Sequence, residues 1–227
     1  SVFISLFESF KILGTMMDQE KVFLESEGDE WFKRNVGKMS NNSSEISTLG
    51  AWLKPFQAEI SRILEVGSGC GNKLAQLCTE LDSDGLGIDP SKLAVDYANR
   101  KFSSKCKFRI GTADSLPSNL KNLDLIHFGF CLYLVSRNRL LKCVRQADLL
   151  LKPGGFISIF DFDPSESCSN EYCHYKGVIS YKEDYYKLFC SLGNYSLVNK
   201  LSFSEESFHF ALNPESRVSL TLLFKEK

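Results

Sequence analysis

The sequence predicts a single α/β domain built on a mostly parallel sheet with helices on both faces. Short apolar runs alternate with helix-forming stretches over residues 62–162, at the spacing of βαβ units. The first apolar run ends in a glycine-rich turn that lets the backbone bend sharply into a helix. The chain has 227 residues, which is enough for one ordinary domain with a modest extension. We therefore expect a doubly wound domain at residues 48–227, preceded by a helical and loop lead-in at 1–47.

Seven strands are expected in this domain. The last two lie close together in the sequence and are expected to pair antiparallel at one edge of the sheet. The expected strands are Arg62–Val66, Gly85–Asp89, Cys106–Gly111, Leu123–Phe130, Phe156–Phe162, Tyr195–Phe203 and Arg217–Phe224. The expected helices are Thr48–Glu59, Lys73–Leu81, Lys92–Lys101 and Arg137–Leu151.

The lead-in divides into three parts. Residues 18–35 mix acids with apolar side chains, as an amphipathic helix does, and the polar stretch 38–48 is expected to be a mobile loop. Residues 1–15 do not have the basic start and long apolar core of a signal peptide. Met16 and Met17 can mark the natural start, which would make residues 1–15 non-native, or residues 1–15 can form a real amphipathic helix; the sequence leaves both open.

Composition limits the partners and the location of the protein. The formal net charge is −1 and the cationic residues are scattered, so no nucleic-acid partner is expected. No segment has the apolar length of a membrane span. The eight cysteines form no CxxC pair, which favours free thiols in a reducing, cytoplasmic compartment. Cys168, Cys173 and His174 cluster locally without a second ligand pair, so no metal site is expected.

Four features fall at the ends of successive strands. They are the glycine turn entered through Glu65, the acid Asp89, the acid Asp114 and the turn 152–155. Each has a structural explanation of its own, as a tight turn or a helix N-cap. As an ordered set they indicate a nucleotide-like ligand at the carboxyl edge of the sheet, where open α/β folds bind their ligands.

These features resemble a known family. The phrases EVGSGCGN, GIDPS, GTADSLP, LDLIHFGFCLYL and LLKPGGFISIFDF are similar to those of class I S-adenosylmethionine-dependent methyltransferases over Ile63–Asp163. The resemblance implies a Rossmann-like fold, S-adenosyl-L-methionine as cofactor and S-adenosyl-L-homocysteine as product.

The resemblance also implies which residues bind the cofactor. The methionine end would be held by Glu65 and by the loop that contains Gly67, Ser68, Gly69 and Gly71. The ribose hydroxyls would bind Asp89, with Ile88 and Pro90 flanking the adenine and Ala113 and Asp114 reading its edge. Phe128 and Gly129 would pass beside the sulfonium.

The glycine pattern also bears on two rival functions. An acid before the glycines suits a ligand with an ammonium and a sulfonium, whereas a dinucleotide turn would place a third glycine at Asn72. A NAD-dependent oxidoreductase is therefore the weaker alternative. A non-catalytic module that binds the cofactor is a third possibility, which the sequence leaves open.

Candidate catalytic residues are expected near the ends of the fourth and fifth strands. His174, in the stretch CSNEYCHYKG, is either a general base on a loop over the site or a solvent-facing histidine. Tyr133 either faces the acceptor or packs in the core. His127 lies within an apolar run and is expected to be a core residue. In the lead-in, Trp31 and Phe32 either cap the cofactor or dock the helix.

The acceptor is the least determined part of the function. The chain has FGFCLYL after its fourth strand, where nucleic-acid amino methyltransferases typically carry Asn or Asp followed by two prolines and an aromatic residue. The stretch ESEGDEWFKRN loosely resembles methylases of bacterial surface-sugar biosynthesis. We therefore expect a small-molecule acceptor, a hydroxyl of a sugar or sugar nucleotide, ahead of another small metabolite or a protein. The sequence does not predict an oligomeric state.

Overall fold

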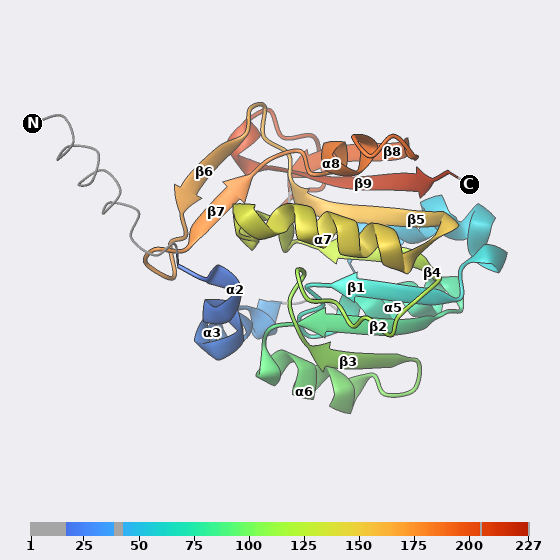
Figure 1. Ribbon diagram of the computed structural model, residues 1–227, viewed down its shortest axis with the longest axis horizontal. Helices are drawn as coiled ribbons and strands as arrows, with labels where there is room; N and C mark the ends of the chain where they lie inside the picture. The colour runs from blue at the N-terminus through green and yellow to red at the C-terminus, as the bar shows by residue number, and fades with distance from the viewer. Residues whose placement is uncertain (1–16, 39–42, 205, 227) are drawn as a thin grey trace, which may run out of the picture.

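The computed structural model describes residues 17–38, 43–204 and 206–226, and its centre is a seven-stranded sheet (Figure 1). The strand order is β3-β2-β1-β4-β5-β9-β8, and β9 is antiparallel to both of its neighbours. The strands are β1 (Arg62–Val66), β2 (Asp84–Asp89), β3 (Cys106–Ile110), β4 (Leu123–Gly129), β5 (Leu151–Phe162), β8 (Tyr195–Ser204) and β9 (Arg217–Lys225). The structure confirms the predicted mostly parallel sheet with an antiparallel C-terminal strand.

Helices cover both faces of this sheet. On one face, α4 (Ser44–Leu53), α5 (Asn72–Leu81) and α6 (Lys92–Lys101) bury their apolar side chains with Ile63 and Leu125. On the other face, α7 (Arg137–Leu150) and α8 (Tyr186–Cys190) pack on Leu64 and Ile126. Because β1 and β4 contribute alternate residues to the two cores, the central strands are apolar almost throughout, as in other doubly covered parallel sheets.

The lead-in lies at the carboxyl ends of the parallel strands (Figure 1). It is a nearly continuous helix made of α2 (Gln19–Val22), the π-helical turn η1 (Phe23–Glu27) and α3 (Gly28–Asn35), followed by the 3₁₀ turn η2 (Val36–Lys38). A hairpin of β6 (Cys168–Glu171) and β7 (Ile179–Lys182) lies next to the start of this helix (Figure 1). The predicted amphipathic helix over 18–35 is confirmed.

Three local predictions were wrong. The stretch 38–48 was expected to be a loop, but α4 begins at Ser44 because Ile46, Leu49 and Leu53 form one buried helical face. The α-helix expected to reach Glu59 ends at Leu53, and the 3₁₀ helix η3 (Lys54–Glu59) continues it, with a proline in its first turn. The stretch 168–177 was expected to be a loop throughout, but its first four residues form β6, and His174 lies in the loop that joins β6 to β7.

Short connecting 3₁₀ turns complete the fold. They are η4 (Leu132–Leu134) after β4 and η5 (Pro214–Ser216) before β9. Residues 1–15, whose origin the sequence left open, lie outside the described residues. Among the described helices, none combines the length and the apolar character that crossing a bilayer requires. The division into a lead-in and a domain at residue 48 stays a prediction.

Candidate active site

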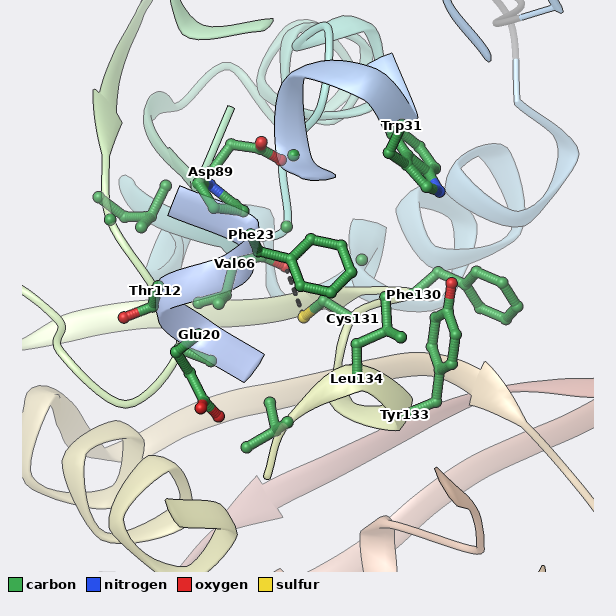
Figure 2. A pocket seen from close by; sticks show the side chains of 18 residues that line it. Glu20, Phe23, Trp31, Val66, Asp89, Thr112, Phe130, Cys131, Tyr133 and Leu134 are labelled. Carbon is green, nitrogen blue, oxygen red and sulfur yellow. Dashed lines mark hydrogen bonds between the residues drawn. The ribbon is translucent and has the colours of Figure 1, made fainter. Parts of the chain in front are cut away.

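A pocket lies at the carboxyl ends of β1, β2 and β4, with a cavity of about 110 Å³ (Figure 2). Residues of the lead-in and of the turn after β4 also line this pocket. Of the residues predicted from sequence, those that line it are Trp31, Gly67, Ile88, Asp89, Pro90, Ala113, Gly129 and Tyr133. The structure thus brings together side chains from strand ends that are far apart in the chain.

The carboxylate of Asp89 holds the glycine turn in place. Its Oδ2 accepts the N–H of Gly69 at 2.7 Å and its Oδ1 accepts the N–H of Ser91 at 2.9 Å. Gly67 and Gly71 adopt φ angles of +79° and +80°, which favour glycine. Burial raises the pKa of Asp89 to about 6. Each carboxylate oxygen has a second lone pair, so Asp89 can still accept two hydroxyl groups of a ligand in the pocket.

Glu65 is a buried acid behind the floor of the pocket. Its side chain is 1% exposed, and neither of its oxygens has a hydrogen-bond partner among the described residues. Burial raises the pKa of this carboxyl to about 8, so it is mostly protonated at neutral pH. A Cβ placed on Gly129 would lie 3.0 Å from Glu65 Oε1. Gly129, which lines the pocket, therefore packs against this buried acid with no side chain between them.

His127 stands beside Glu65 on the same face of the sheet, because the two residues are register partners in β1 and β4. Its side chain is 1% exposed, and its Nδ1 lies 3.1 Å from Ser158 Oγ. Burial lowers the pKa of the imidazole to about 3. At neutral pH the pair is a neutral acid next to a neutral imidazole, and the prediction that His127 is a core residue is confirmed.

Asp114 lies under the pocket wall and does not line the pocket. It accepts hydrogen bonds from Thr112 Oγ1 at 2.6 Å and from Arg139 Nη1 at 2.9 Å. Burial alone would raise its pKa, but these two bonds hold the pKa below its ordinary value. The neighbouring residues Thr112 and Ala113 line the pocket instead. A role for Asp114 in reading adenine stays a prediction. In that role its carboxylate would accept hydrogen bonds from the adenine and from Arg139 at the same time.

Two polar side chains of α2 fix the lead-in over the pocket. Gln19 accepts the N–H of Ile179 at 2.6 Å and donates to the carbonyls of Leu134 and Ile179 at 2.9 and 3.2 Å. Glu20, which lines the pocket, accepts both the N–H and the hydroxyl of Ser136 at 2.8 and 2.7 Å. The lead-in is therefore hydrogen-bonded to the hairpin and to the start of α7.

A second contact joins α3 to the hairpin. Buried Glu27 pairs with Arg34 and accepts a hydrogen bond from Tyr172 Oη at 3.2 Å. Trp31 points to the pocket, while Phe32 is buried against α6, with its ring 5.8 Å from that of Tyr97. Of the two positions that the sequence left open for these aromatic residues, Phe32 docks the helix against α6, whereas Trp31 lines the pocket.

The turn after β4 forms an aromatic wall. Phe130 has a φ of +59°, a strained value for a bulky residue, and strain of this kind is concentrated at functional sites. Its ring lies 5.1 Å from that of Phe160 and 5.0 Å from that of Tyr133. The carboxylate of Asp161 accepts the backbone N–H groups of Leu132 and Tyr133 and so holds this turn.

Several predicted site residues do not line the pocket. Phe128 is fully buried, with its ring 6.0 Å from that of Phe189. His174 is exposed on the hairpin turn, where its ring lies edge-on to Tyr172. Ser68, Gly69 and Gly71 form the turn beneath the lining residues. Roles for these residues in cofactor binding or catalysis stay predictions.

Sequence reasoning missed several lining residues. Those outside the predicted set include Glu20, Phe23, Gly28, Phe130 and Leu134. Most of them lie on the lead-in or just after β4, and only the amphipathic pattern of residues 18–35 hinted at a buried face. In the part of the chain that the structure describes, no group of three or more His, Cys, Asp and Glu side chains is placed to hold a metal ion.

The strand order, the glycine turn and the acid after β2 together define a class I methyltransferase fold. Residues 63–155 match the model of the methyltransferase domain family. A methyltransferase from Burkholderia thailandensis, solved with 1,6-didemethyltoxoflavin and S-adenosylhomocysteine, is similar with a TM-score of 0.67 and 14% identity over 92% of this chain and 87% of that one. The chain therefore has the fold of these methyltransferases, as the motifs indicated, and its residues 63–155 match the methyltransferase domain.

Two other relatives are also similar to this chain. The N-methyltransferase NodS from Bradyrhizobium japonicum, solved with S-adenosylhomocysteine, has a TM-score of 0.61 and 15% identity over 92% of this chain and 97% of that one. The tRNA N(3)-methylcytidine methyltransferase trm140 of Schizosaccharomyces pombe is 29% identical over 59% of this chain and 48% of its own length. The chain spans about half or less of the curated relatives it matches.

The tRNA enzyme among these relatives bears on the expected partners. The prediction that nucleic acid is excluded rested on net charge and on the sequence after the fourth strand. The relatives do not support that exclusion, so it is open to experiment.

Proposed function

We propose that this protein transfers a methyl group from S-adenosylmethionine to a small-molecule acceptor. The observation that carries the proposal is the position of Asp89. Its carboxylate ends β2 at the pocket, beside the glycine turn of a methyltransferase domain. In this position an acid can accept the two hydroxyl groups of a ribose.

The other lining residues suit the rest of the cofactor. Ile88, Pro90 and Ala113 offer apolar surface for the adenine, and Gly67 and Gly129 leave room for the methionine end. Glu65, buried without a partner behind Gly129, would meet the ammonium group. When bound, the cofactor supplies a methyl group already activated by positively charged sulfur, while these residues orient it and exclude water.

Electrostatics favours this cofactor over a dinucleotide. The lining residues of the described pocket include the acids Glu20 and Asp89 but no lysine or arginine. A pyrophosphate would therefore be buried close to carboxylates without a cation to pair with it. A NAD-dependent oxidoreductase remains the weaker candidate for this reason.

The acceptor is expected to be small because the lead-in closes the pocket. Of the two catalytic candidates, Tyr133 lines the pocket and His174 does not. The sequence favoured a sugar or sugar-nucleotide hydroxyl of the surface-glycan type, but the diphosphate of a sugar nucleotide would meet no lining cation. Methylation of tRNA is the second candidate, because one relative is a tRNA methyltransferase. A cytoplasmic location stays a prediction.

A screen with tritiated-methyl S-adenosylmethionine tests the proposal. The acceptors are a sugar nucleotide, neutral aromatic metabolites, bulk tRNA and a protein extract. We expect label in the small-molecule fractions alone. Label in tRNA would favour the second candidate, and cofactor binding with no transfer to any fraction would favour a non-catalytic module.

A further inference from the structure

The part of the pocket that lies beyond the cofactor residues is aromatic. Figure 2 shows Phe23, Trp31 and Tyr133 around one space, and Phe130 and Leu134 line the same pocket. The ring of Phe130 packs on those of Phe160 and Tyr133, which restricts its movement. Rigid aromatic walls favour flat, apolar ligands, because ring stacking adds to the gain from burial.

The charges around this space disfavour an anionic ligand. Arg34 belongs to the lead-in and Arg139 lies close to it, but both are already paired: Arg34 with Glu27, and Arg139 with Asp114, Asp18 and Glu20. The described lining residues include no lysine or arginine, and the cation that pairs with Glu20, Arg139, is already shared among three acids. A phosphate or carboxylate on the acceptor would lose its hydration here without gaining a partner.

Among the residues that the structure describes, the lining contains no histidine, and its two carboxylates, Glu20 and Asp89, already take part in hydrogen bonds with the protein. Both oxygens of Glu20 already accept hydrogen bonds from Ser136. Asp89 accepts two backbone N–H groups and faces the ribose position. His174 is exposed on the hairpin turn. An alcohol needs general-base help to become a nucleophile, whereas an aromatic ring nitrogen or aryl amine carries a free lone pair at neutral pH.

We propose that the acceptor is a small, flat aromatic molecule without negative charge, methylated on a ring nitrogen or aryl amine. This inference rests on the proposed methyltransferase function. In the transfer, the nitrogen lone pair forms a bond to the methyl carbon while the carbon–sulfur bond breaks and leaves its electron pair on sulfur. Where the nitrogen carried a hydrogen, that proton then passes to solvent water.

The two tryptophans allow a direct binding test. Trp31 lines the pocket, and Trp52 lies on α4, outside the lining. In Trp52→Phe the remaining tryptophan reports on the pocket, and Trp31→Phe is the matched control. Each variant is first shown to bind S-adenosylhomocysteine by calorimetry. If neither the variants nor the wild type bind it, the proposed function itself fails.

With S-adenosylhomocysteine bound, benzimidazole, 2-naphthol and UDP-glucose are titrated separately. We expect benzimidazole to quench the fluorescence of Trp52→Phe but not that of Trp31→Phe, and to bind the wild type about tenfold tighter than UDP-glucose, as burial of an aromatic ligand predicts. With S-adenosylmethionine, benzimidazole should gain a methyl group on nitrogen, while 2-naphthol should bind without being methylated.

Three results would overturn the inference while leaving the cofactor site intact. They are binding of UDP-glucose as tight as that of benzimidazole, methylation of 2-naphthol at a rate similar to benzimidazole, and no binding of either aromatic probe.

Discussion

The ionisation of Glu65 gives a prediction that can be worked out from the structure. Burial raises the pKa of this carboxyl from 4.5 to about 8, so the folded protein keeps a proton that the unfolded chain gives up. Between these values the folded state binds more protons than the unfolded state, and stability must fall as the pH rises. At about 1.36 kcal/mol per pKa unit, this group alone lowers the free energy of unfolding by about 3 kcal/mol between pH 5.5 and 8.5.

Urea unfolding of the wild type and of Glu65→Gln at both pH values measures this effect. The glutamine variant keeps the shape of the neutral acid but cannot ionise, so its stability should lack this fall. Titrating groups far from Glu65 act on both proteins and cancel in the comparison, whereas Asp89 and His127 are close to it and contribute a smaller difference. Glu25→Gln, at an exposed position of the lead-in, should behave like the wild type. If Glu65→Gln and the wild type depend on pH in the same way, the carboxyl is not held neutral and our reasoning about it fails.

Three further changes test the site and its closure. In Gly129→Ala the new Cβ would lie 3.0 Å from Glu65 Oε1, so calorimetry should show the affinity for S-adenosylmethionine falling about tenfold. The control Gly37→Ala, whose new Cβ would meet nothing within 4 Å, should bind S-adenosylmethionine as the wild type does. Equal affinities of the two variants would show that a side chain at position 129 does not disturb the site. Gln19→Ala removes three hydrogen bonds and should cost about 2–3 kcal/mol in urea unfolding. An unchanged unfolding midpoint would show that this link does not hold the lead-in. Tyr172→Phe removes one bond to a buried acid, so the melting temperature followed by circular dichroism should fall by about 2–4 °C, and no change would mean that water replaces the hydroxyl.

The sequence predicted the parts of the fold that depend on local patterns. Buried parallel strands such as Ile63–Val66 are apolar runs, and the glycine turn and Asp89 follow them at fixed spacing, so the mostly parallel sheet and a pocket at its carboxyl edge could be expected. The start of α4 at Ser44 was missed because its polar first turn hides an apolar face that begins at Ile46.

The acceptor side could not be predicted in the same way. Glu20 and Phe23 reach the pocket only because Gln19 bonds to Ile179, a residue 160 positions further along the chain. The strained backbone of Phe130 follows from the packing of its ring on Phe160. No local pattern encodes contacts between such distant segments, so the lead-in could be predicted as a helix, while the sequence left open whether Trp31 and Phe32 cap the cofactor or dock the helix.

Calorimetric titration of S-adenosylmethionine into the wild type and Asp89→Asn, with NAD titrated in parallel, tests the central claim most directly. We predict that S-adenosylmethionine binds one site on the wild type and that NAD gives no binding heat. Asp89→Asn should lower the affinity for S-adenosylmethionine about tenfold to a hundredfold, because it removes a charged acceptor for the ribose hydroxyls. Binding of NAD in place of S-adenosylmethionine, or the same S-adenosylmethionine affinity in both proteins, would contradict the account.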